Sequence, residues 1–129
     1  MYKNLAPMLL VDDVDEALAW YQDVLGAKLA YKLPDDPPFE WVSILLDGVE
    51  IMLANKQAAQ GWYTDAVKSA DTPTNCIIYI YVEDTEALYG RIKNKAKVVM
   101  KPADQYYGMR EFAIQDPFGF ILIFAETLE

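Results

Sequence analysis

The chain has 129 residues, of which 53% are hydrophobic and 13% aromatic, enough for the packed core of one domain, and this excludes a disordered chain. Twenty acidic residues against eleven basic ones give a formal net charge of -9, which opposes binding to nucleic acid and to anionic membrane surfaces and favours a cationic ligand. No apolar run approaches the roughly 20 residues that span a bilayer, and the opening stretch does not read as a signal peptide, so we expect a soluble, cytoplasmic protein without a membrane partner.

The first half of the chain predicts a strand, a helix and three further strands. Residues 5–11 form an apolar run, and the next segment, 12–26, begins with acids and ends at Gly26, as a capped helix does. Three strands are expected to follow, at residues 27–33, 39–46 and 49–54. A tight Asp47-Gly48 turn would join the last two. The predicted order is βαβββ.

The second half of the chain repeats this order after a connecting loop. The expected elements are a strand at 76–82, a helix at 84–95, a strand at 97–101 and a hairpin at 107–124. The residues correspond too, because VDD at 11–13 matches VED at 82–84 in front of the two helices. Likewise, Asp47–Val49 corresponds to Asp116–Phe120, which we interpret as a hairpin two residues longer.

We therefore predict a single domain, residues 1–129, of the α+β class. Two tandem βαβββ modules would form a curled mixed sheet around a cleft, with the helices on the outer face. The expected bounds are about 4–55 for module one, 56–74 for the connecting loop and 75–127 for module two. Ligands usually sit in such a cleft.

The chain has one cysteine and no histidine. Cys76 cannot form a disulfide within the chain, and it stands at the start of a strand-like run, so we expect a buried thiol that packs as a small hydrophobic side chain. The absence of histidine excludes the usual Ser-His-Asp triad.

Two motifs in this duplicated order resemble the vicinal oxygen chelate superfamily, which includes glyoxalases, extradiol dioxygenases, fosfomycin resistance enzymes and bleomycin-resistance binding proteins. They are LVDDVDEALAWYQDVLG at 10–26 and YGMREFAIQDPFGFILIF at 107–124. The resemblance covers nearly the whole chain and implies the fold predicted above. It also implies a homodimer, and, in members that bind metal, His, Glu or Gln ligands on the first and last strands of each module.

The resemblance places the four metal-ligand positions of this chain at Ala6, Met52, Ile77 and Ile123. Met52 follows Ala6, and Ile123 follows Ile77, by the same spacing in the two modules. None of the four carries the imidazole or carboxylate that catalytic divalent metals require, so we predict no metal and no other cofactor. A displaced site, in which Glu50 shares the face of Met52, is the alternative.

Period-two alternation from Ile77 and Ile123 predicts which side chains line the cleft. Further members of this face would be Met8, Leu10, Tyr79, Tyr81 and Ile121, whereas Leu9, Val11, Ile78, Ile80, Phe120, Leu122, Phe124 and Glu126 would face the helices. On the assumption of a two-residue turn, the neighbouring strands would add Trp41 and Ser43 in module one and Arg110 and Phe112 in module two. The predicted ligand-binding residues are Met8, Trp41, Glu50, Met52, Tyr79, Tyr81, Arg110, Phe112 and Ile123, with Glu50 and Arg110 as polar anchors.

Two pairs of aromatic residues are candidates to cover the cleft. Trp62 and Tyr63 stand in the connecting loop, and Tyr106 and Tyr107 stand at the start of the last hairpin. The first pair could instead bury against a partner chain. The second pair could equally be ordinary aromatic residues at a strand edge.

Three functions remain open. The favoured one is a metal-independent binding protein that holds a cationic or amphipathic aromatic molecule, because aromatic faces attract cations and stack on planar ligands; it would resemble the bleomycin-resistance branch, with antibiotic resistance as one role. The second is a glyoxalase- or dioxygenase-like enzyme with a displaced metal site. The third is an interaction protein whose cleft is filled by its own side chains.

Overall fold

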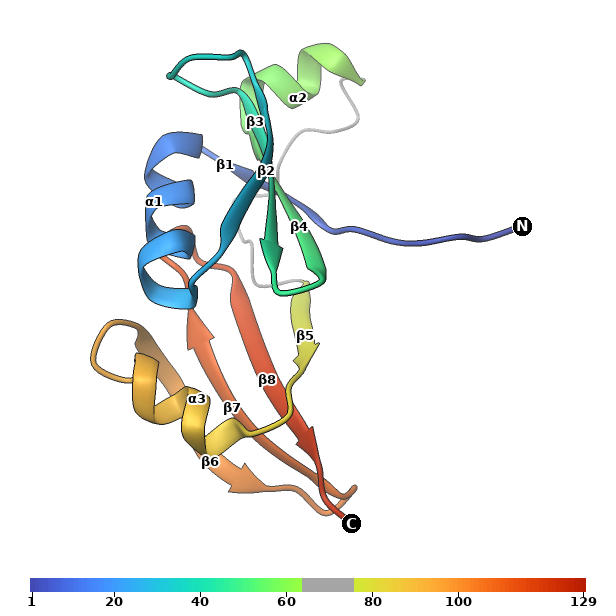
Figure 1. Cartoon of the computed structure of the whole chain (residues 1–129), viewed down its shortest axis with the longest axis vertical. Coiled ribbons are helices and arrows are strands. Elements are labelled where there is room, and N and C mark those ends of the chain that lie inside the picture. The colour runs from blue at the N-terminus through green and yellow to red at the C-terminus, as the bar shows by residue number, and fades with distance from the viewer. Residues whose placement is uncertain (64–75) are drawn as a thin grey trace. The chain divides into compact units, whose positions relative to one another are not determined.

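The chain forms two compact units, Met1–Ala70 and Asp71–Glu129, and the computed structural model describes residues 1–63 and 76–129 of them. Each unit contains one βαβββ module with its own four-stranded mixed sheet (Figure 1). The predicted α+β fold of two tandem modules is therefore confirmed. Among the described residues, no helix has the length and apolar character needed to cross a membrane.

Module one builds its sheet in the order β1-β4-β3-β2. Its elements are β1 (Met8–Val11), α1 (Val14–Leu25), β2 (Lys28–Leu33), β3 (Trp41–Leu46) and β4 (Val49–Asn55). Strand β1 runs parallel to β4, and the remaining neighbours are antiparallel. Helix α1 crosses from β1 to β2 and packs on β3 and β4.

Helix α1 begins and ends where the sequence predicts. The Asp13 side chain caps its first turn by accepting a hydrogen bond from the Glu16 backbone N–H at 3.0 Å. Gly26 ends the helix with φ +70°, in the left-handed region that glycine adopts without a steric penalty. The helix face against the sheet is apolar, and it buries Val14, Ala17, Leu18, Tyr21 and Val24.

The start of the connecting segment is helical, so the prediction of a loop throughout 56–74 is wrong for its first part. Helix α2 (Lys56–Trp62) follows β4 directly, and the Asn55 side chain caps it by accepting from the Ala58 N–H at 3.0 Å. The Asn55 amide also donates to the Asp12 carbonyl at 3.1 Å, which ties the start of α2 to the end of β1. A short run with two alanines and an Asn cap is typical of a helix of about two turns added after a strand.

Module two repeats the arrangement with the order β5-β8-β7-β6. Its elements are β5 (Ile77–Tyr81), α3 (Thr85–Ile92), β6 (Lys97–Asp104), β7 (Met109–Gln115) and β8 (Ile121–Thr127). Strand β5 runs parallel to β8. Helix α3 packs on this sheet, against β6, β7 and β8 (Figure 1).

Helix α3 has two acidic partners at its N-terminus. Asp84 caps the first turn by accepting from the Ala87 N–H at 3.0 Å. Glu126, from the last strand, accepts from the Thr85 N–H at 3.0 Å and from the Thr85 hydroxyl at 2.9 Å. The prediction that Glu126 faces the helix is therefore confirmed.

The two hairpins that join the last strands of the modules differ in length by an odd number of residues. In module one, Leu46 pairs with Val49, so the turn is Asp47-Gly48, with Asp47 at φ +53°. In module two, Gln115 pairs with Ile121, and the whole of Asp116–Phe120 lies between them. The interpretation of a hairpin two residues longer is wrong, because the second connection is three residues longer.

The side chain of Asp116 closes this longer connection. Its carboxylate accepts from the backbone N–H groups of Phe118 and Phe120, both at 2.9 Å. Gly119 then adopts φ +95°, which a side chain would resist. Aspartate followed by proline and a later glycine is typical of such a closed turn.

Cys76 is exposed, so the prediction of a buried thiol is wrong. It precedes Ile77, the first paired residue of β5, and therefore lies outside the ladder that would have buried it.

Candidate functional site

Each sheet has one face covered by a helix and one face turned away from it. We call the second face of module one the Met52 face and that of module two the Ile123 face. The Met52 face comprises Met8, Leu10, Trp41, Ser43, Glu50 and Met52, and the Ile123 face comprises Ile77, Tyr79, Tyr81, Glu111, Ala113, Ile121 and Ile123. These faces hold all the side chains that the sequence predicts to line a cleft except Arg110 and Phe112.

The Met52 face is arranged as predicted. Met8 and Ser43 both lie beside Met52 in the register, and Trp41 lies beside Ala54, one position further along the same face. Ser43 is 1% exposed and its hydroxyl donates to the Glu50 carboxylate at 2.5 Å. Glu50 therefore shares this face, where its carboxylate is bound to a neighbouring strand.

On the Ile123 face, the predicted positions of β5 are confirmed and those of β7 are wrong. Tyr79 lies beside Ile123, as expected. Arg110 lies beside Glu126 and Phe112 beside Phe124, both of which share the helix-covered face. The odd difference in hairpin length is the reason, since alternation with period two moves every residue of β7 to the opposite face.

Arg110 and Phe112 have structural contacts on the helix-covered face. The Phe112 ring is fully buried, stacks on Phe124 with a centroid distance of 5.1 Å and meets Tyr89 of α3 edge-on at 5.3 Å. Arg110 forms a bidentate ion pair with Asp104, at 2.7 and 3.2 Å. Hydrogen bonding to Arg110 lowers the pKa of Asp104, and the same contact raises the pKa of Arg110.

Glu111 of β7 lies on the Ile123 face, where the sequence predicts Arg110 and Phe112. Only 2% of it is exposed, and its carboxylate accepts hydrogen bonds from the Tyr79 hydroxyl and, at 2.7 Å, from the Tyr107 hydroxyl. These donors come from β5 and from the turn before β7, so three separate segments meet at one carboxylate. From the sequence, Glu111 could be placed near these strands but not among the ligand-binding residues, because the number of residues between the last two strands decides which face it shares.

The surroundings of Tyr79 and Tyr107 in this cluster raise the pKa of both phenols. Burial, followed by the hydrogen bond to Glu111, raises the pKa of Tyr79, and the hydrogen bond to Glu111 raises the pKa of Tyr107 to about 12. Both phenols therefore stay protonated at neutral pH and donate to the carboxylate, which accepts through both oxygens. The result is a buried acceptor beneath two partly exposed tyrosine rings.

Around this cluster the Ile123 face is apolar and accessible. Ile77 is 54% exposed, Tyr79 38% and Tyr81 72%, and the last two rings meet edge-on at 5.3 Å. Large apolar side chains are costly to leave in water, so a contiguous group of them marks a surface that a ligand or partner covers. The face thus combines aromatic area with a negative centre.

The family's metal-ligand positions do not fit a metal ion in this chain. Ala6 and Met52 in module one, and Ile77 and Ile123 in module two, offer no imidazole and no carboxylate, which catalytic divalent metals prefer. Within residues 1–63 and 76–129, no three His, Cys, Asp or Glu side chains gather closely enough to hold a metal. Glu50, the proposed substitute, is hydrogen-bonded to Ser43 instead.

The aromatic residues predicted to cover a cleft are largely exposed. Trp62 and Tyr63, at the end of α2, are 45% and 60% exposed. Tyr106 is almost fully exposed and meets Tyr107 edge-on at 5.1 Å. Tyr107 supports Glu111, and a covering role for the other three stays a prediction.

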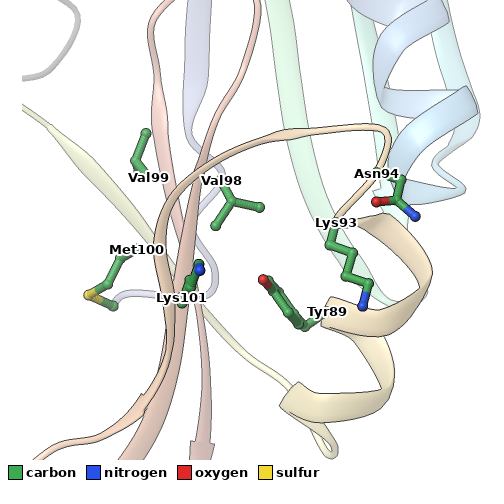
Figure 2. A pocket seen from close by; sticks show the side chains of 7 residues that line it. All are labelled: Tyr89, Lys93, Asn94, Val98, Val99, Met100 and Lys101. Carbon is green, nitrogen blue, oxygen red and sulfur yellow. The ribbon is translucent and has the colours of Figure 1, made fainter.

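A pocket of about 350 Å³ lies elsewhere in module two, between α3 and β6 (Figure 2). Its lining residues are Tyr89, Lys93, Asn94, Val98, Val99, Met100 and Lys101. Val98 pairs with Ile114, a fully buried residue of the sheet core. The pocket therefore belongs to the helix-covered side of the sheet, away from the Ile123 face.

The chain belongs to the Glyoxalase/Bleomycin resistance protein/Dioxygenase superfamily, whose model matches residues 5–124. The resemblance drawn from the two motifs is therefore confirmed for the superfamily, and the bleomycin-resistance branch stays a prediction. No curated protein sequence matches the chain.

Several solved structures are similar over nearly the full length. TioX from Micromonospora sp. ML1 is 20% identical, with a TM-score of 0.84, and the match covers 98% of this chain and 100% of TioX. A glyoxalase/bleomycin resistance protein/dioxygenase from Nocardioides is 19% identical over 100% of this chain and 86% of its own, with a TM-score of 0.78. A glyoxalase/bleomycin resistance protein/dioxygenase family enzyme from Burkholderia phytofirmans PsJN is 16% identical over 95% and 97%, with a TM-score of 0.75. At these identities the likeness establishes the fold alone.

Proposed function

We propose that the protein binds a small cationic, aromatic molecule without the help of a metal ion. The molecule would bind on the Ile123 face of module two. The observation that carries this proposal is the buried Glu111 carboxylate beneath the exposed rings of Tyr79 and Tyr107. A cation above such rings is attracted by their π faces and by the charge beneath them. The acidic chain adds a weaker long-range attraction.

Metal independence is supported by the chemistry of the four family positions. Their side chains are one methyl group, one thioether and two isoleucines, at Ala6, Met52, Ile77 and Ile123. Such side chains contact the apolar part of a ligand and do not polarise a carbonyl or activate water. Binding without chemistry needs only shape, apolar area and charge complementarity.

A homodimer is part of the same proposal. Its support is the family resemblance together with the exposed apolar side chains of the edge strand β2, which are Leu29, Tyr31 and Leu33. Exposed apolar edge strands tend to be covered in the working protein. Light scattering across a range of protein concentrations measures the oligomeric state, and a monomer at all concentrations would contradict this part.

The binding proposal is tested by calorimetric titration of the full chain with cationic aromatic dyes such as ethidium. Fluorescein, an anionic aromatic dye, is the comparison ligand. We expect saturable binding of the cation, weakened about tenfold in Glu111→Gln, since the substitution removes the charge and keeps an acceptor for the tyrosines.

The matched control is Glu86→Gln, which removes one negative charge from the exposed first turn of α3, on the helix side of the same module. The wild-type affinity should persist in this variant. The proposal fails if no cationic dye saturates the wild-type protein, or if both substitutions weaken binding equally, because the second result would indicate net charge and not the Ile123 face.

A further inference from the structure

In one segment of this acidic chain, every charged residue is basic. Residues 91–101, RIKNKAKVVMK, hold five of the eleven basic residues and none of the twenty acidic ones. All five are exposed. The ion pairs within residues 1–63 and 76–129 join Lys56 to Asp12 and Arg110 to Asp104, so the basic segment contributes to neither. None of its charges therefore forms an ion pair within the described part of the chain, although the protein as a whole carries a net charge of -9.

The pocket between α3 and β6 draws its lining from this segment. Figure 2 shows Tyr89 and Lys93 on the helix side, with Val98 and Lys101 on the strand side. The polar groups of the lining are two ammonium groups, the Asn94 amide and one phenol, and no carboxylate is among them. The Lys93 ammonium lies 5.8 Å from the centroid of the Tyr89 ring.

This set of groups defines the chemistry of a ligand. Ammonium groups only donate, and the amide and phenol can donate too, so the pocket can satisfy several acceptor oxygens at once. The Tyr89 ring and Val98 supply an apolar surface beside the donors. A volume of about 350 Å³ accommodates a small organic molecule.

We propose that the pocket between α3 and β6 binds a small organic oxyanion, a phosphate or carboxylate, held by Lys93, Lys101 and Asn94 with its apolar part against Tyr89. This site is separate from the Ile123 face, because it lies on the helix-covered side of the sheet. The net charge of -9 repels anions at long range, so binding depends on these local donors and weakens as salt rises.

The test is a titration of the full, isotope-labelled chain followed by NMR, with sodium phosphate and sodium benzoate as the probes. Sodium chloride at equal ionic strength is the reference. We expect saturable shifts centred on residues 89–101 with at least one probe, and affinity at least about tenfold weaker in the double variant Lys93→Ala with Lys101→Ala. Saturation by phosphate or by benzoate tells which oxyanion the pocket prefers.

The matched control is Lys95→Ala with Lys97→Ala, which removes two exposed lysines of the same basic segment that are not among the lining residues of the pocket. This variant should bind like the wild type. Shifts that only follow those of chloride, or equal weakening in the two double variants, would overturn the proposal. If the alanine variant loses its dispersed spectrum, Lys93→Gln with Lys101→Gln removes the charges while keeping most of the side-chain length, and the same outcomes apply.

Discussion

The two modules share an order of elements but differ in the hairpin that joins their last two strands. The turn of module one is Asp47-Gly48, whereas Asp116–Phe120 connects the strands of module two. The odd difference leaves Ser43 on the Met52 face and moves Phe112 away from the Ile123 face. The comparison teaches that a repeated pattern predicts architecture, while the length of a connection decides which chemistry faces the ligand.

The same difference changes where each module keeps its carboxylate. In module one, Glu50 of β4 accepts from Ser43 of the neighbouring strand. In module two, Glu111 of β7 accepts from Tyr79 and Tyr107, and it is far more deeply buried than Glu50. A deeper carboxylate needs more donors, because unsatisfied charge in a dry environment is expensive.

The largest expected effect comes from Phe112→Ala. Phe112 is fully buried between Phe124 and Tyr89, so its truncation should lower the free energy of unfolding by about 3–5 kcal/mol, measured by urea denaturation. Trp41→Ala, on the half-buried Met52 face, should lower it clearly less. If Phe112→Ala costs no more than Trp41→Ala, the register of β7 given above is contradicted.

A smaller effect should separate the two hairpins directly. Gly119 has φ +95°, so Gly119→Ala should lower the free energy of unfolding by about 1–3 kcal/mol. Gly48 has its φ outside the left-handed range and no atom within 4 Å of an added Cβ, so Gly48→Ala should be neutral or slightly stabilising. Thermal or urea unfolding of both variants measures the contrast, and similar losses in the two would argue against the different turn geometries.

The sequence predicted the architecture because its signals were local. Asp13 and Gly26 cap α1, and strict alternation along β5 and β8 places Tyr79 beside Ile123. The Asp47-Gly48 turn, read correctly as two residues, put Trp41 on the Met52 face. Each of these inferences depends on residues within one element or one tight turn.

The candidate site was predicted only in part, because one of its residues depends on a count across a turn. From the sequence, the connection between Gln115 and Ile121 was counted one residue too short. Phe112 was therefore placed on the Ile123 face, where the structure has Glu111. The Tyr107 hydroxyl reaches Glu111 from the turn before β7, and no periodic pattern predicts that contact. Helix α2 was missed for another reason, since its few residues are too short a run to show helical periodicity.

The smallest expected effect is a shift in titration, and it tests the cluster that distinguishes module two. The hydrogen bond to Glu111 raises the pKa of Tyr107 to about 12, whereas the pKa of tyrosine in an unfolded chain is about 10. In Glu111→Gln, the Tyr107 titration should move back toward the ordinary value. Carbon NMR of labelled tyrosine follows each phenol, and an unchanged Tyr107 titration in Glu111→Gln would contradict the contact.

The free energy of unfolding should depend on pH through the protonation of Tyr107. Protonated Tyr107 is the form that donates to Glu111, so its contribution is fully present below a pH of about 10 and is lost as the pH rises through the folded-state value of about 12. The difference in free energy of unfolding between the wild type and Tyr107→Phe should therefore shrink across that interval. In Glu111→Gln the same Tyr107→Phe substitution should show a weaker pH dependence, because the carboxylate that favours the protonated phenol is gone.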